Sequence, residues 1–281
     1  MTAVSPQMRA RIEGELARIE TEEQATILFA IESGSRAWGF HSGDSDYDVR
    51  FVYARPVDWH LSLLPGRDVI ERPLDDELDI SGWDLRKALN LMLSGNAVIG
   101  EWLRSPLTYR RLPVTDDLMT LATDVLRPKP AGWHYLRLMQ RQKARLIGPH
   151  GGVRLKRLFY TVRPALTLRW LRRHGRGAAP MDMPTLLAET DIPKDMHAQI
   201  DALTALKMSR PEAGELEEHP ADLLAFLEGQ EQAAEAWLAA TPQQPVSPEH
   251  IAAAERLHRH VIHSVTSSPT PNPGTDRTRV L

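Results

Sequence analysis

The chain has 281 residues, enough for one large domain or two small ones, and its 42% hydrophobic and 25% charged residues are typical of a globular protein. It contains no cysteine, which excludes disulfides, thiol nucleophiles and zinc–thiolate sites. The net charge is −3, no apolar run approaches about 18 residues and no signal-peptide pattern opens the chain, so we expect a cytoplasmic protein with no membrane partner.

The first predicted elements are a helix and a strand. Residues 6–23 have apolar positions every three or four residues, which is the periodicity of an amphipathic helix. A strand near residues 26–31 follows, and its apolar run stops at Gly34 and Ser35. A short polar loop then leads to a second apolar run. This order of strand, glycine turn, loop and strand indicates two strands of one sheet.

The second predicted strand, residues 46–53, begins with two acidic residues. Side chains alternate between the faces of a strand, which puts Asp46, Asp48 and Arg50 on one face. The opposite face is apolar and can join a core. Neighbouring carboxylates repel each other unless a cation lies between them. Asp46 and Asp48 are therefore predicted to be metal ligands.

The spacing of Asp44, Asp46 and Asp48 imitates the start of a calcium-binding loop. Val49 and Arg55 occupy the positions at which that loop requires a glycine and an acidic residue, so we reject a calcium site. A few hard oxygen ligands suit Mg2+ that is held partly by substrate phosphates.

Phosphate ligands are predicted at the glycine turn. The amides of Gly34 and Ser35, the Ser35 hydroxyl and the Arg36 charge could bind a triphosphate. Asp46 and Asp48 would then hold two Mg2+ ions, or Mn2+ in their place, between the phosphates and an attacking hydroxyl.

A β-hairpin is predicted over residues 68–81, and its second arm presents a third carboxylate. Two-metal transfer chemistry uses such a group as base or as extra metal ligand. We choose Asp79, with Glu77 as the competitor. The alternative is an edge strand whose charges prevent aggregation. Asp84 directly precedes a strong helical pattern and is predicted to be its N-cap.

The pattern is helical from about residue 115, and prolines and a glycine near residue 130 mark a boundary. We therefore divide the chain into a catalytic domain, residues 1–127, and a helical domain, residues 128–264. Residues 265–281 have few apolar side chains and are predicted to be a disordered tail.

Positive charge is concentrated in the helical region. Residues 125–181 contain fourteen Lys and Arg but no Asp or Glu. Such a block is an electrostatic footprint for phosphates or nucleic acid. The alternative is a solvated surface that pairs with the acidic segment of residues 212–235. We favour the first interpretation because the metal motif independently requires an anionic ligand.

The motif resembles a known family. Gly34-Ser35, a gap of ten residues and Asp46-x-Asp48 are similar to the signature of the DNA polymerase β superfamily of nucleotidyltransferases. The longer match runs from Glu32-Ser-Gly-Ser-Arg-Ala-Trp-Gly to Ile80-Ser-Gly-Trp-Asp-Leu. It resembles the RlaP-type branch, predicted nucleotidyltransferases associated with bacterial RNA repair. The resemblance covers roughly residues 25–175.

The resemblance implies an α+β fold: a nucleotidyltransferase-like mixed β-sheet core with helices, followed by an all-helical C-terminal domain, with the active site between them. It also implies that Lys156, Tyr160 and Arg163, on one predicted helix, bind the nucleotide. The residues alone allow a half-buried surface stripe instead. Glu101, in a short preceding helix, is predicted to lie at the surface.

The implied activity is metal-dependent transfer of a nucleoside monophosphate from an NTP to a hydroxyl, with release of pyrophosphate. RNA is the expected acceptor, and Asp46, Asp48 and Asp79 are the expected catalytic and metal-binding residues. Two alternatives remain open: transfer to a protein hydroxyl, and a nucleotide- or RNA-binding module without turnover. The two intact aspartates argue against the module, because a binder does not need both.

Overall fold

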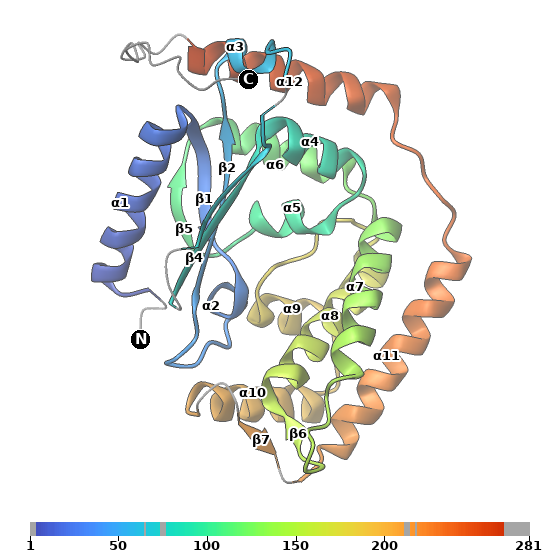
Figure 1. Ribbon diagram of the computed structural model, residues 1–281. Coiled ribbons are helices and arrows are strands. Elements are labelled where there is room, and N and C mark those ends of the chain that lie inside the picture. Colours follow the sequence, from blue (N-terminus) through green and yellow to red (C-terminus); the bar gives the residue numbers. More distant parts are fainter. Residues whose placement is uncertain (1–3, 65, 74–76, 211–213, 217, 267–281) are drawn as a thin grey trace.

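The computed structural model describes residues 4–64, 66–73, 77–210, 214–216 and 218–266. Its centre is a five-stranded mixed sheet in the order β3-β4-β2-β1-β5 (Figure 1). Its strands are β1 (Thr26–Glu32), β2 (Tyr47–Ala54), β3 (Val69–Pro73), β4 (Leu78–Asp84) and β5 (Thr108–Arg111). β2 and β4 pair in parallel, and the other neighbours pair antiparallel.

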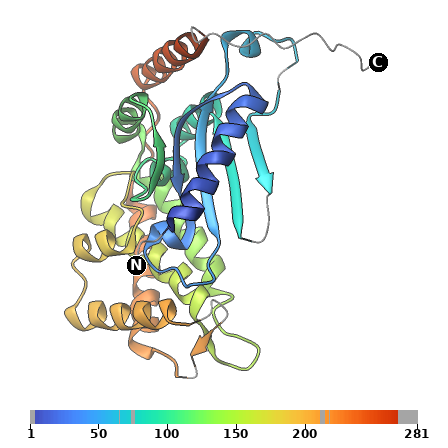
Figure 2. The same ribbon diagram turned by 90° about the vertical axis from the view of Figure 1, so that its left-hand side faces the viewer.

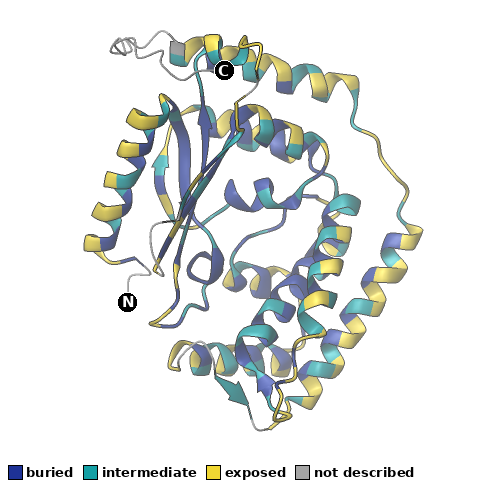
Figure 3. Ribbon diagram, in the orientation of Figure 1, coloured by how far each residue is buried: buried dark blue, intermediate teal, exposed yellow. Residues whose placement is uncertain are grey.

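One face of the sheet is covered by α1 (Pro6–Glu23), which lies across the strands in Figure 2. The Ser5 hydroxyl caps this helix by accepting a hydrogen bond from the Met8 amide at 3.1 Å. Ile12 and Leu16 are fully buried and belong to the same core as the apolar face of β2. Figure 3 shows the outer surface of α1 exposed, as expected of an amphipathic helix.

The other face of the sheet packs against four helices: α4 (Leu85–Leu93), α5 (Ala97–Trp102), α6 (Val114–Val125) and α12 (Pro248–Thr266). α12 is the last helix, yet its buried Ala254 and Val261 join the core of α4 and α6. The chain therefore returns from the helical region to the sheet. The predicted helical domain of residues 128–264 contains most of α12, but α12 packs with α4 and α6 against the sheet.

The remaining helices pack around a core of their own. They are α7 (Pro128–Lys143), α8 (Leu155–His174), α9 (Met183–Glu189), α10 (Lys194–Met208) and α11 (Ala221–Ala240). A small ribbon of β6 (Val153–Arg154) and β7 (Glu215–Leu216) joins α8 to the segment before α11. Phe40, which follows the short helix α2 (Gly34–Trp38), inserts into this helical core.

The α+β fold class is confirmed, with the mixed sheet first and helices after it. The predicted hairpin is the β3–β4 pair, and its turn lies outside the described ranges. The tail predicted over residues 265–281 begins too early, because residues 265 and 266 belong to α12, and the rest of it lies outside the described ranges. β5 was not predicted from the sequence, and the short helix α3 (Val57–His60) follows β2. No helix in the described ranges is long and apolar enough to span a membrane.

Candidate active site

The parallel pairing of β2 and β4 brings two predicted site residues together. Asp48 and Asp79 are directly paired in register across these strands. One nitrogen of Arg50, Nη2, lies 3.1 Å from Asp48 Oδ1 and 2.7 Å from Asp79 Oδ2. Arg50 shares the strand face of Asp48, so strand alternation and parallel pairing together form this triad. The Arg50 guanidinium places positive charge between two neighbouring carboxylates that would otherwise repel each other.

Negative charge accumulates around Asp48. Burial raises the pKa of the Asp48 carboxyl, and the nearby carboxylates of Asp79 and Asp46 raise it further, whereas Arg50 and Lys156 lower it. The Asp79 side chain is 56% exposed and Asp46 is also exposed. The three predicted carboxylates therefore lie within electrostatic range of one another, with Asp48 the most enclosed.

A buried acid supports Asp48 from behind. Glu32, the last residue of β1, has no exposed surface, accepts a hydrogen bond from the Asp48 amide at 3.0 Å and accepts another from the Tyr109 hydroxyl at 2.5 Å. Burial raises the pKa of Glu32 to about 7. Glu32 thus fixes the backbone that carries Asp48, and it does so with a carboxyl that titrates near neutrality.

Gly34 allows the glycine turn to approach Asp48. Its φ of +59° lies in the left-handed region, and a Cβ on this residue would lie 2.0 Å from Asp48 Oδ2. The Ser33 amide also donates to the Asp48 carbonyl at 2.8 Å. The turn and the carboxylate are therefore in direct contact.

Arg36 has a different position from the one expected of a phosphate ligand. It is buried, donates to the carbonyls of Ser45 at 2.6 Å and Asp46 at 3.1 Å, and lies over the Tyr47 ring with 3.7 Å to the centroid. These contacts hold the loop that delivers Asp46. We therefore assign Arg36 a positioning role, and Ser35 is likewise buried in the short helix α2.

α8 contributes two side chains to the same region. The Tyr160 ring packs edge-on against Trp38 of α2 at 5.1 Å between centroids, and Lys156 Nζ lies 5.8 Å from the Tyr160 centroid. Lys156 also lowers the pKa of Asp48 by its charge. Tyr160 therefore lies against the helix that follows the glycine turn, and Lys156 lies within electrostatic range of Asp48.

Arg163, the third residue predicted on this helix, lies in the interior. Its side chain is 2% exposed, and it donates to Glu101 Oε1 at 2.8 Å and to the Met181 carbonyl at 2.9 Å. Tyr135 donates to the same Glu101 oxygen at 2.5 Å. The prediction that Glu101 lies at the surface is therefore wrong, because a buried arginine and a buried tyrosine both use it as acceptor. In this buried position Arg163 is not accessible to a nucleotide.

The residues present fit a cation by their chemistry, with one obstacle. Asp46, Asp48 and Asp79 offer the hard oxygen donors that Mg2+ prefers. However, Arg50 occupies one oxygen of Asp48 and one of Asp79, and no group of three acidic or histidine side chains in the described ranges is arranged to hold a metal ion. For a metal ion to bind at this position, the Arg50 guanidinium would have to move away from these carboxylate oxygens.

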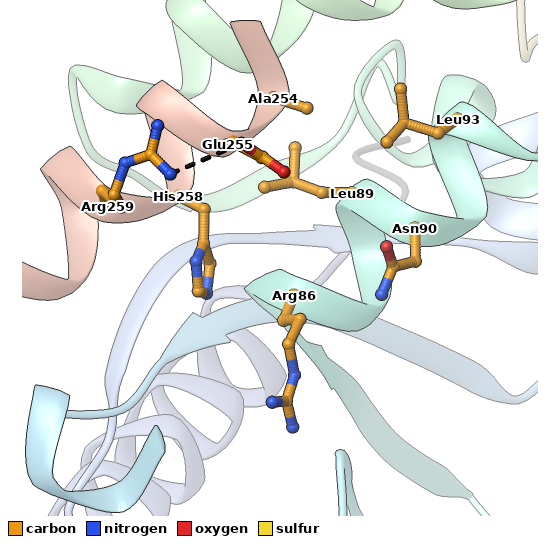
Figure 4. Close-up of a pocket in the computed structure, with 8 residues that line it drawn as sticks. All are labelled: Arg86, Leu89, Asn90, Leu93, Ala254, Glu255, His258 and Arg259. Carbon is orange, nitrogen blue, oxygen red and sulfur yellow. Dashed lines mark hydrogen bonds and ion pairs between the residues drawn. The ribbon is translucent and has the colours of Figure 1, made fainter. Parts of the chain in front are cut away.

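A second polar cluster lies at the other end of the sheet, where α12 packs on α3 and α4. The rings of His60 and His258 meet edge to face at 5.1 Å, and burial lowers the pKa of His258 to about 4. A hollow of about 270 Å³ lies between α4 and α12, and His258 and Arg86 are among the residues that line it (Figure 4). Asp84 caps α4 by accepting from the Arg86 amide at 2.8 Å, as predicted. These contacts attach α12 to the sheet.

Comparison with known proteins identifies the family. The model of the RlaP family, described as "RNA repair pathway DNA polymerase beta family", matches residues 8–262. The chain belongs to the RlaP family. It is also 42% identical over 202 residues to "Uncharacterized protein YcgL" of Bacillus subtilis (strain 168), a match that covers 71% of this chain and 76% of that protein. The suspected RlaP-type resemblance is thus confirmed, and the family match includes every residue of the candidate site.

Sequence reasoning did not single out two residues that contact Asp48 in the candidate site, Glu32 and Arg50. Both carried a signal. Glu32 is an acid at the end of an otherwise apolar strand, a position that demands a hydrogen-bonded partner in the fold. Arg50 shares the strand face of two aspartates, where a cation has an evident role.

Proposed function

We propose that this protein is a metal-dependent nucleotidyltransferase that moves a nucleoside monophosphate from an NTP to a hydroxyl of RNA and releases pyrophosphate. The observation that carries the proposal is the meeting of Asp48 and Asp79 beside Gly34, opposite Lys156 and Tyr160, in a chain of the polymerase β class. RNA as acceptor is supported by the family description and by the basic helices.

Each residue has a physical role in this proposal. Asp46, Asp48 and Asp79 would hold two Mg2+ ions, or Mn2+, which would neutralise phosphate charge as it develops during transfer. Gly34 lets the backbone of the Gly34–Ser35 turn approach Asp48, because a side chain at Gly34 would collide with the Asp48 carboxylate. Lys156 supplies positive charge, and Tyr160 supplies an aromatic surface that is half-buried against Trp38. Glu32 keeps the Asp48 backbone in place.

The test is incorporation of label. The protein is incubated with each of the four α-labelled NTPs, Mg2+ or Mn2+, and either RNA or a mixture of protein acceptors. Label on RNA is the expected result. Label on protein alone would overturn the choice of acceptor, and no label on any acceptor would overturn the proposed reaction.

Two variants make the test specific. Asp48→Asn should abolish incorporation while circular dichroism and thermal unfolding stay close to those of the wild type, because the amide keeps the shape of the side chain. Asp68→Asn is a matched control, since Asp68 pairs with Lys87 at 2.9 Å on the outer side of the hairpin, away from Asp48. Equal loss of activity in both variants would contradict the assignment of Asp48.

A further inference from the structure

The basic helices of residues 127–176 divide into two kinds of positive charge. Many of the side chains are engaged within the chain: Lys143 pairs with Glu228 and Glu231 of α11, and Arg154 lies 3.6 Å from Glu215. These contacts match the interpretation that basic residues pair with the acidic C-terminal segment. They account for part of the charge and leave a remainder.

That remainder includes a row that we call the arginine stripe: Trp133, Arg137 and Arg141 on the outer face of α7, and Arg145 in the turn directly after it. Its members follow one another at intervals of four residues, so the three on α7 occupy neighbouring positions along one side of the helix, and all four are exposed. Within the described part of the chain, the side chains of the three arginines make no hydrogen bond or ion pair. Like charges at this spacing repel one another, and an anionic ligand would relieve that repulsion.

The N-terminal part of the arginine stripe borders a hollow. A space of about 330 Å³ lies between the turn that ends α4, at Gly95 and Asn96, and the stripe residues Trp133, Arg137 and Arg141. Trp133 is 40% exposed, which is unusual for so large an aromatic ring, and the Arg137 guanidinium lies 5.8 Å from its centroid. A partly exposed indole beside an arginine is suited to stacking with a nucleobase.

The arginine stripe lies on the helix that supports the candidate site. α7 packs along α8, the helix that carries Lys156 and Tyr160, and the two helices run side by side in Figure 1. A ligand on α7 would therefore be held by the same rigid pair of helices that faces Asp48. Separated arginines recognise a chain of phosphates, and one exposed aromatic ring recognises an unpaired base.

We propose that the arginine stripe binds a single-stranded segment of RNA, with phosphates along Arg137, Arg141 and Arg145 and a base stacked on Trp133. This inference rests on the proposed function, because the bound strand would be the acceptor. The charge of the stripe selects a polyanion, and the open indole selects a single strand over a duplex, whose bases are already stacked.

The test measures binding of a short fluorescent single-stranded RNA by anisotropy, without NTP, at several salt concentrations. The variant R137A/R141A/R145A should bind at least about tenfold more weakly, and the slope of log affinity against log salt should decrease by about 2, since each phosphate contact on a single strand contributes about 0.7. W133A should bind about tenfold more weakly with an unchanged salt slope, whereas W133F should retain most of the affinity.

The matched control is R18A/R67A/R259A, which removes the same charge from exposed arginines on α1, on the loop before β3 and on α12. This control should bind RNA like the wild type. Wild-type affinity in the stripe variant, equal loss in the control, or a duplex bound as tightly as a single strand would each overturn the inference.

The two proposals fail in different ways. Binding of RNA that depends on the arginine stripe, together with absence of label transfer to RNA, would contradict the proposed reaction and support the stripe. Label transfer to RNA with an unchanged KM for RNA in R137A/R141A/R145A would contradict the stripe and support the reaction.

Discussion

Asp48 and Asp79 are neighbours across a parallel pair of strands, and a single nitrogen of Arg50 contacts both carboxylates. The arginine therefore provides the positive charge that the pair needs before any metal arrives. A divalent cation bound at these carboxylates would compete with this guanidinium for the same oxygens. The effect of substituting Arg50 on metal binding therefore tests the proposed metal site.

Arg50→Gln should lower the thermal stability of the metal-free protein by about 1 kcal/mol, because the two carboxylates then repel each other and one partner, Asp79, is largely exposed to screening solvent. Added Mg2+ should raise the Tm of the variant more than that of the wild type, since the competing cation is gone. Differential scanning fluorimetry with a Mg2+ titration measures both effects. An identical Mg2+-induced shift in the two proteins would show that Arg50 and the metal do not compete.

Gly34→Ala should destabilise the protein by about 1–2 kcal/mol from the left-handed backbone alone, and should reduce nucleotidyl transfer by about a hundredfold or more because the new Cβ displaces the Asp48 carboxylate. Gly14→Ala is the control, since a Cβ at Gly14 of α1 meets no atom within 4 Å. That change should leave activity unaltered and stabilise the helix slightly. Equal activities of the two variants would refute the close approach.

Glu32 should make stability depend on pH. The pKa of Glu32 is about 7 in the folded protein against its ordinary value of 4.5, so the folded state holds the proton more tightly. This contribution to the free energy of unfolding is fully present below pH 4.5 and is lost as the pH rises through 7. The loss amounts to about 3 kcal/mol for a shift of this size.

Glu32→Gln keeps a neutral side chain at every pH, and its free energy of unfolding should therefore fall less than that of the wild type between pH 5 and pH 8. Urea titrations at both pH values measure the difference. The conservative comparison is Glu71→Gln, because Glu71 forms an exposed pair with Arg67. A wild-type pH profile in the Glu32 variant would show that another group is responsible.

Arg163→Met should cost about 3–5 kcal/mol of stability, because it leaves the buried Glu101 carboxylate without its cation. Arg173→Met, which removes an exposed partner of Asp191, should cost at most about 1 kcal/mol. Urea unfolding compares the two. Folded Arg163→Met should bind Mg-NTP like the wild type; a large loss of affinity at unchanged stability would restore Arg163 to the nucleotide site.

The local parts of the site were predictable from sequence because they depend on periodicity. Alternation along β2 correctly separated Asp48 and Arg50 from the apolar face, and the position of Asp84 before a helix correctly marked an N-cap. The meeting of Asp48 with Asp79 needed one further step, the pairing of β4 with β2. The sequence suggested a common sheet, and the pairing is seen only in the fold.

The remaining features depend on contacts between distant segments. Spacing on α8 put Lys156, Tyr160 and Arg163 in one stripe, yet one of the three turns inward because Glu101, 62 residues earlier, supplies a buried acceptor. Charge counting likewise found the basic block but could not separate Lys143, which pairs with α11, from Arg141, which does not. Periodicity describes a face of a helix and leaves its partner unspecified.

The return of α12 to the sheet has a consequence for truncation. The chain crosses from the sheet to the helical core between α6 and α7 and returns in residues 241–247, after which α12 packs on α4 and α6. Removal of α12 would take away this return and would expose apolar surface of α4 and α6 to water.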